Sequence, residues 1–219
     1  MPPNPRPLRS LNPPKLYAIV DAELCAAAGR APVDVARAFL SGGARWIQLR
    51  CKSTGSGAFL DLAHLILQDT NSAGGTLIIN DRADIVALAG APGLHVGQED
   101  LAPADARTVI GTAPILGLST HTQDQWERAV KEPISYLAIG PVFGTATKHT
   151  GYHAIGLETV RRAAQAASQQ GLPTVAIGGI TLENAASVIE AGARSVAVIS
   201  DLLTGDPEAR VRALIRILE

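Results

Sequence analysis

The sequence is short of aromatic residues and of net charge. Phe, Trp and Tyr together make up 4% of the 219 residues, whereas Ala, Leu, Val and Ile are abundant. That balance is typical of helices layered on a sheet, where aliphatic side chains fill the space between the layers. The formal net charge is −1, so no overall field favours nucleic acid or a membrane surface as a partner. Any anionic ligand must therefore be bound by a local group of side chains.

Cysteine is also scarce, and long apolar runs are missing. Cys25 and Cys51 cannot form a disulfide framework and lack metal-ligand spacing, so we expect two reduced thiols in a cytoplasmic protein. No apolar run approaches the roughly 20 residues of a membrane span. The proline-rich residues 1–14 lack the apolar centre of a secretory signal, and we interpret them as an extended or mobile arm. Residues 15–219 are then one domain, and the sequence leaves a homo-oligomer open.

Strand-like and helix-like segments alternate along the whole domain. The expected strands lie at 15–21, 46–52, 76–80, 94–97, 115–119, 136–142, 174–178 and 195–200. The expected helices lie at 32–44, 59–70, 83–89, 103–110, 123–131, 157–169, 183–191 and 207–218. Eight such units predict a single (β/α)8 TIM barrel, with an open doubly wound sheet as the alternative. In a barrel the chemistry belongs at the C-terminal ends of the strands, which is where the polar residues concentrate.

Two acids follow two successive strands. Asp81 comes after Ile78-Ile79-Asn80, and Asp100 follows the next strand, with Gln98 close to it. A single acid in such a place is commonly a helix cap or a surface residue. Two of them at neighbouring strand ends favour Mg²⁺, which binds through one or two carboxylates together with a substrate phosphate.

Cations follow the second strand. Side chains alternate between the faces of a strand, so Gln48, Arg50 and Lys52 share the face that points into the barrel mouth, while Leu49 and Cys51 point toward the helices. Two inward cations need an anion to offset their desolvation. The alternative is an ordinary solvated strand end. The pattern favours a phosphate or diphosphate ligand.

Three later segments carry further polar groups. Ser119 and His121 end the fifth strand on one side, and either can meet a ligand or serve the structure. The loop 140–148 offers two hydroxyls and Lys148 to an anion, unless it is simply a solvated loop. Gly179 and Ser200 follow strands seven and eight, where barrels commonly bind phosphate through backbone N–H groups. Two anion sites facing each other would suit two phosphorylated substrates that are joined together.

Six runs of the sequence resemble the thiamine-phosphate synthase family in their order and spacing. They are QLRCK, IINDRADIVALAGAPGLHVGQEDL, GLSTHT, GPVFGTATK, GLETVRRAA and VAIGGITLENAASVIEAGARSVAVIS. The resemblance extends from about Leu16 to Leu203. It implies a (β/α)8 barrel that joins a hydroxymethylpyrimidine diphosphate to a thiazole phosphate, or its carboxylate form, and releases thiamine phosphate and diphosphate.

The resemblance also implies a role for each matching residue. The pyrimidine diphosphate would be bound by Gln48, Leu49, Arg50, Cys51, Lys52, Asn80, Ser119 and Lys148. The thiazole phosphate would be bound by Thr145, Ala146, Thr147, Gly179, Ile199 and Ser200. Asp81 and Asp100 would hold Mg²⁺, and the expected catalytic residues are Arg50, Lys52, Lys148 and Ser119. The partners would be small phosphorylated molecules.

The sequence departs from the family pattern at two positions, and two rival functions remain. Cys51 stands where many members have glutamate, and Gly144 stands where proline is frequent. One rival is the thiazole tautomerase of the same family, which has a histidine at the position resembling His121 but tends to lack the full metal and Thr-x-Thr-Lys set. The other is a non-catalytic barrel that binds a phosphorylated ligand, for which Asp81, Asp100 and Lys148 together would have no use.

Overall fold

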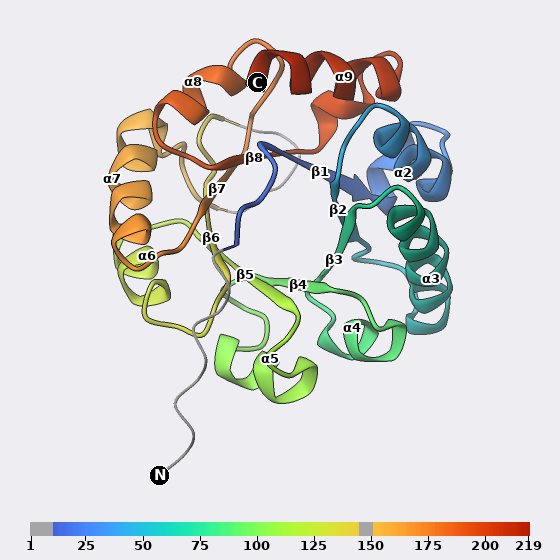
Figure 1. The fold of residues 1–219 in the computed structure, drawn as a ribbon, viewed down its shortest axis with the longest axis horizontal. Coiled ribbons are helices and arrows are strands. Elements are labelled where there is room, and N and C mark those ends of the chain that lie inside the picture. Colours follow the sequence, from blue (N-terminus) through green and yellow to red (C-terminus); the bar gives the residue numbers. More distant parts are fainter. Residues whose placement is uncertain (1–10, 145–150) are drawn as a thin grey trace.

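Eight parallel strands close into a barrel in the computed structural model, which describes residues 11–144 and 151–219 (Figure 1). The strands are β1 (Leu16–Asp21), β2 (Trp46–Arg50), β3 (Thr76–Asn80), β4 (Gly93–Val96), β5 (Ile115–Thr120), β6 (Tyr136–Ile139), β7 (Thr174–Ile177) and β8 (Ser195–Val198). Each strand pairs with the next along the chain, and β8 pairs with β1. The predicted barrel is therefore confirmed, and the open sheet is excluded.

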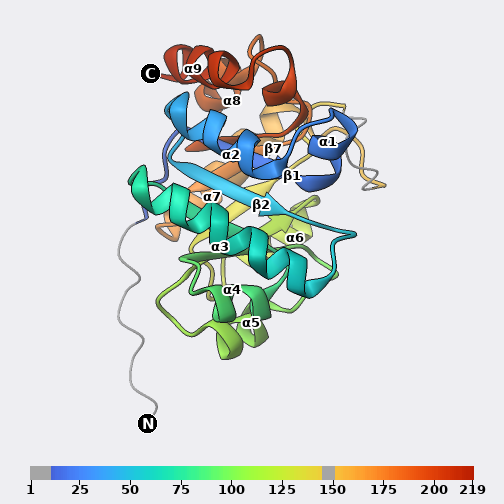
Figure 2. The same cartoon turned by 90° about the vertical axis from the view of Figure 1, so that its right-hand side faces the viewer.

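Helices form the outer layer around this barrel (Figures 1 and 2). They are α1 (Ala22–Ala27), α2 (Pro32–Ser41), α3 (Ser56–Ser72), α4 (Ala83–Ala89), α5 (Pro103–Ile110), α6 (Gln123–Ala129), α7 (Gly156–Gln169), α8 (Ala185–Glu190), the 3₁₀ helix η1 (Ser200–Leu203) and α9 (Pro207–Leu218). In the part of the chain that the structure describes, no helix is both long enough and apolar enough to cross a membrane.

Most segments lie where the sequence predicts them, and the differences have local causes. The short helix α1 was not predicted; it begins because the Asp21 carboxylate accepts a hydrogen bond from the Leu24 N–H and caps the first turn. The β6 strand ends at Ile139 rather than at residue 142, because Pro141 has no N–H to donate to a neighbouring strand. Helix α8 begins at Ala185, two residues later than expected.

Side chains inside the barrel form a packed core of their own. The interior cluster consists of Tyr17, Ile19, Trp46, Ile78, Tyr136, Ala138, Val175 and Ala197. A larger apolar cluster fills the space between the strands and the helices. Gly117 makes room for the ring of Tyr136, since a Cβ at that position would lie 2.0 Å from its Cζ. The interior is therefore filled, and ligands have access to the strand ends only.

The predicted N-terminal arm lies largely outside the described residues. Of its described part, Leu11 packs against the interior cluster. Lys15 follows it and contacts the backbone carbonyl of Leu218 at the end of α9. The division into an arm and a catalytic barrel stays a prediction.

Candidate active site

The C-terminal ends of β1 to β3 and the loop after β4 bring together the first group of predicted site residues. This charged rim consists of four predicted residues, Arg50, Lys52, Asp81 and Asp100, and of Asp21, which was not predicted as a site residue. The Arg50 guanidinium forms an ion pair with Asp21, its neighbour on the adjacent strand. The Lys52 ammonium forms an ion pair with Asp81. The protein thus supplies an anion for each of the two cations that sequence reasoning left without one, and their role in binding phosphate stays a prediction.

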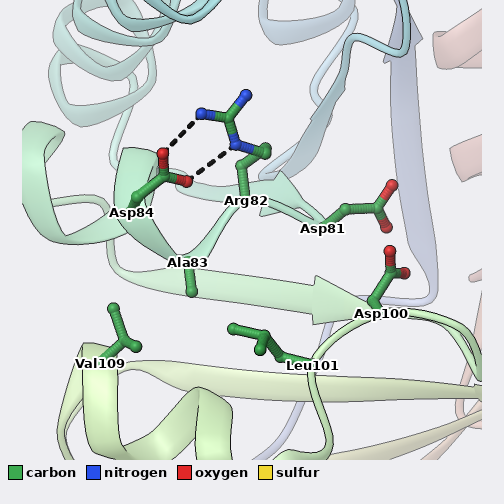
Figure 3. A pocket seen from close by; sticks show the side chains of 7 residues that line it. All are labelled: Asp81, Arg82, Ala83, Asp84, Asp100, Leu101 and Val109. Carbon is green, nitrogen blue, oxygen red and sulfur yellow. Dashed lines mark hydrogen bonds and ion pairs between the residues drawn. The ribbon is translucent and has the colours of Figure 1, made fainter.

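Asp81 and Asp100 form an acidic pair whose carboxylates face each other (Figure 3). Asp81 has a φ of 63°, a left-handed conformation that is uncommon for non-glycine residues, although Asp and Asn adopt it more readily than most. Oδ2 of Asp100 accepts a hydrogen bond of 2.7 Å from the Gly97 N–H. Burial raises the pKa of Asp100, and the neighbouring Asp81 carboxyl raises it further. Two carboxylates that disfavour each other's charge are relieved by a shared cation.

The surroundings of the acidic pair fit a hard cation. Among the described residues, no group of three or more His, Cys, Asp or Glu side chains is suited to a metal. A pair of carboxylates is a contribution that Mg²⁺ commonly uses when substrate phosphates and water complete its shell, and Mg²⁺ binding at this pair stays a prediction. A pocket of about 370 Å³ adjoins the pair, and it is lined by Asp81, Arg82, Ala83, Asp84, Asp100, Leu101 and Val109 (Figure 3).

Glu23 fixes the loop that follows β2. Its Oε1 accepts hydrogen bonds from the backbone N–H groups of Lys52 and Ser53, each at 2.8 Å, and from the Ser53 hydroxyl at 2.9 Å. Burial raises the pKa of Glu23, but the hydrogen bonds from Ser53 and Lys52 outweigh it and lower the value to about 2. Sequence reasoning missed Glu23, because its partners are thirty residues away in the chain.

Within the predicted binding run after Ile47, alternate residues face different layers. Leu49 and Cys51 are buried in the cluster between strands and helices, as predicted, so only their backbone atoms can meet a ligand at the mouth. Burial raises the pKa of the Cys51 thiol to about 12, and the side chain is therefore a neutral packing group. Gln48 is buried on the inner face and bonds to Tyr17.

A chain of hydrogen bonds crosses the barrel interior beneath the mouth. In this floor chain Nε2 of Gln48 donates to Oη of Tyr17 at 2.7 Å, and Oη of Tyr17 lies 3.1 Å from Oη of Tyr136. Oη of Tyr136 lies 2.8 Å from Nδ1 of His95, and Nε2 of His95 lies 2.8 Å from Oγ of Ser119. Sequence reasoning found the two ends and missed the three middle members.

The predicted residue Asn80 and the histidine His121 are not members of the floor chain. Asn80 is buried at the end of β3. His121 does not join Ser119: its Nδ1 lies 2.6 Å from the Gly140 carbonyl oxygen, and its ring stacks on Tyr152 with centroids 4.2 Å apart. The backbone carbonyl of Ser119 accepts a hydrogen bond of 2.6 Å from Gln98. These contacts hold the His121 ring in place.

The opposite side of the mouth is built from backbone. This glycine rim consists of Gly140, Gly178 and Gly179, at the ends of β6 and β7. A Cβ on Gly140 would lie 2.1 Å from the Ile177 carbonyl oxygen, and one on Gly179 would lie 2.6 Å from that of Gly144. Gly179 has a φ of 63°. The backbone strands of this rim therefore approach each other more closely than any side chain permits.

Ile199 and Ser200 follow β8 beside the glycine rim. Ser200 begins η1, and the next residue, Asp201, holds this turn in place. The Asp201 carboxylate accepts hydrogen bonds from the Arg210 guanidinium, at 2.6 and 3.0 Å, and from the Leu182 N–H at 3.2 Å. The predicted binding residues Thr145, Ala146, Thr147 and Lys148 lie outside the described residues.

Known proteins resemble this chain in sequence and in fold. The sequence model of the thiamine monophosphate synthase family matches residues 16–202. The chain is 44% identical over 201 residues to the thiamine-phosphate synthase of Roseiflexus castenholzii, covering 91% of this chain and 86% of that one. It is 42% identical to that of Koribacter versatilis, over 94% and 96% of the two chains. The structure of the thiamine phosphate pyrophosphorylase from Pyrococcus furiosus superposes with a TM-score of 0.85 and 30% identity, over 94% and 96%.

Proposed function

Because the chain belongs to the thiamine monophosphate synthase family, we propose that it catalyses the coupling step of thiamine phosphate synthesis. The substrates are 4-amino-5-hydroxymethyl-2-methylpyrimidine diphosphate and hydroxyethylthiazole phosphate, or the carboxylate form of the latter, whose carboxylate would leave as CO₂. The observation that carries this proposal is the two-sided mouth. A charged rim with an acidic pair faces a glycine rim, and the two suit a diphosphate that leaves and a phosphate that stays.

On the charged side, Asp81 and Asp100 would hold Mg²⁺, which when bound supplies positive charge against the diphosphate. Arg50 and Lys52 each exchange a protein carboxylate for a phosphate oxygen when the substrate arrives. Lys148 is assigned to the same anion by the family resemblance. These cations stabilise the charge that builds on the diphosphate as the bond between the methylene carbon and the bridging oxygen breaks. The electron pair of that bond leaves with the diphosphate.

On the other side, the thiazole phosphate is assigned to Gly179, Ile199 and Ser200, together with the segment 145–147. Anchoring that phosphate places the thiazole nitrogen toward the pyrimidine methylene. The nitrogen lone pair then forms the new C–N bond. The coupling requires no nucleophile from the protein, so positioning and electrostatics account for catalysis.

The test is an incubation of the protein with both substrates and Mg²⁺, followed by chromatography for thiamine phosphate and diphosphate. Parallel reactions omit one substrate or contain excess EDTA. We expect equal amounts of the two products in the complete reaction and none in the others. Conversion of the thiazole carboxylate tautomer without coupling would identify the tautomerase instead, and ligand binding without either reaction would identify a non-catalytic barrel.

A further inference from the structure

In the floor chain each side chain donates a hydrogen bond to the next, and the donors and acceptors of its members determine which way the donation runs. It joins five strands, from Gln48 on β2 through Tyr17, Tyr136 and His95 to Ser119 on β5. The coupling reaction proposed above makes no use of its three middle members. All five side chains are buried, so each proton in the chain needs a partner.

The first donor in the floor chain is the side-chain amide of Gln48. Its nitrogen can only donate, so Oη of Tyr17 accepts this hydrogen bond. Among the described residues, Oη of Tyr17 has one other hydrogen-bond partner, Oη of Tyr136. The Tyr17 proton is therefore satisfied by donation to Tyr136. If Tyr136 donated instead, the fully buried hydroxyl proton of Tyr17 would be left without a hydrogen bond, which is unfavourable.

The same reasoning passes along the chain to histidine. Burial raises the pKa of both Tyr17 and Tyr136 far above the ordinary phenol value, so each phenol carries one proton to donate. Tyr136 accepts from Tyr17 and donates to Nδ1 of His95. Nδ1 is then the unprotonated nitrogen of a neutral imidazole, and the ring proton sits on Nε2, 2.8 Å from Oγ of Ser119.

Packing holds the central phenol in the place this chain needs. The Tyr136 ring contacts the rings of Trp46 and Tyr17 at centroid distances of 5.4 and 6.1 Å, and lies nearly parallel to the His95 ring with an interplanar angle of 17°. A Cβ on Gly117 would lie 2.3 Å from Oη of Tyr136. The absence of a side chain at Gly117 is thus what lets the hydroxyl reach its partners.

We infer that the floor chain fixes His95 as the neutral Nε2–H tautomer and thereby makes Ser119 a hydrogen-bond donor toward the mouth. Oγ of Ser119 accepts from His95, so its own proton is directed to an acceptor atom of the ligand, such as a pyrimidine ring nitrogen. A neutral imidazole also places no positive charge beneath a pyrimidine on which positive charge develops. His95 and Tyr136 are on this account positioning residues. The ligand in this statement rests on the proposed function, whereas the tautomer does not.

The tautomer is measured directly by two-bond ¹⁵N–¹H correlation NMR on the full-length protein labelled with ¹⁵N-histidine, at neutral pH without Mg²⁺. The chain has five histidines, and the His95 signals are those missing from the His95→Gln variant. We expect a protonated Nε2 and an unprotonated Nδ1. In Tyr136→Phe, which removes the donor to Nδ1, we expect an Nδ1–H population to appear and kcat/KM for coupling to fall about tenfold.

Tyr17→Phe is the matched control. It removes one buried phenol hydroxyl from the same network but leaves the Tyr136 donor to His95 in place. We expect it to retain the Nε2–H tautomer and to lose about threefold in kcat/KM. Thermal melts verify that each variant is folded. If a variant does not fold, the tautomer measured in the wild-type protein decides whether the inference holds.

Three results would overturn the inference. An Nδ1–H tautomer in the wild type means that the chain runs the other way, with Ser119 donating to His95. A His95 ring protonated on both nitrogens would contradict the neutral tautomer. Equal activity losses in the two tyrosine variants, with the tautomer unchanged in both, remove the positioning role. Absence of coupling activity in the wild type would refute the proposed function and leave the NMR result standing.

Discussion

At the charged rim, Arg50 and Lys52 already have protein carboxylates as partners, whereas at the glycine rim the backbone itself leaves no space for a side chain. The first arrangement changes most easily at Lys52, whose ion pair with Asp81 is partly exposed to water. Asp21 in the Arg50 pair is buried, so that pair opens only when a ligand anion takes the place of the carboxylate. The second cannot change, because a fixed backbone shapes it. A departing diphosphate alters its charge during the reaction and a phosphate anchor does not. On the proposed assignment, the adaptable side chains would serve the anion that changes, and the fixed backbone would help to hold the anion that stays constant.

Removing a charge from the acidic pair should have the largest effect on activity. Asp81→Asn keeps a residue type that tolerates the φ of 63° while removing the carboxylate. Loss of metal-assisted charge stabilisation amounts to several kcal/mol, so Mg²⁺-dependent coupling should fall on the order of a thousandfold. Initial rates against Mg²⁺ concentration give the size of the loss.

Asp84→Asn is the control for that variant. Asp84 lines the same pocket but pairs with Arg82 and is half exposed. Its coupling rate should stay within about threefold of wild type, since exposed ion pairs contribute little. Similar losses in the two variants would remove the distinction between the acidic pair and the rest of the pocket.

Adding a methyl group to the glycine rim should chiefly affect stability. In Gly179→Ala the Cβ would meet the Gly144 carbonyl oxygen at 2.6 Å, and the φ of 63° is unfavourable for alanine. We expect the free energy of unfolding to fall by about 3 kcal/mol and KM for the thiazole phosphate to rise. Urea denaturation followed by circular dichroism measures the first, and steady-state kinetics the second.

Gly205→Ala separates backbone conformation from close approach. Gly205 has a similar φ of 69°, but no atom lies within 4 Å of the Cβ that would be added. The conformational cost alone is about 1 kcal/mol, and KM should not change. If the two alanine variants lost equal stability, the glycine rim would owe nothing to tight backbone contact.

Neutralising Glu23 should give the smallest effect, one that depends on pH. The pKa of Glu23 in the fold is about 2, below its ordinary 4.5, so its stabilisation is present above pH 4.5 and is lost as pH falls through about 2. Glu23→Gln should lower the free energy of unfolding by about 1 kcal/mol at pH 7, because the side chain is partly exposed and screened by water. The difference from wild type should vanish toward pH 2, and urea titrations at several pH values would reveal it. A constant difference across that range would contradict the assignment.

The sequence predicts the succession of elements well where glycine and proline punctuate it. The bounds of β3, α4, α5 and α9 agree residue for residue with the prediction, since Gly75, Gly90, Gly111 and Pro207 mark their starts or ends. Helix α1 was not predicted, because in the sequence Asp21 marks only the end of a strand. Its capping hydrogen bond to the Leu24 N–H is visible only in the structure.

The charged rim could be located from the sequence, but its pairing could not. Strand alternation places Arg50 at the mouth, yet it cannot say whether its partner is a ligand or Asp21 on the adjacent strand. The floor chain could not be predicted from the sequence at all. Tyr17 and Tyr136 are 119 residues apart, and only closure of the barrel brings their hydroxyls within hydrogen-bond distance.

The filled barrel interior has a consequence for how ligands enter and leave the site. Tyr17, Trp46 and Tyr136 occupy the axis, and Leu11 packs against them from the N-terminal arm. The ligands of the proposed reaction would therefore enter and leave at the strand ends. A product still bound there would occupy the place that the next substrate needs.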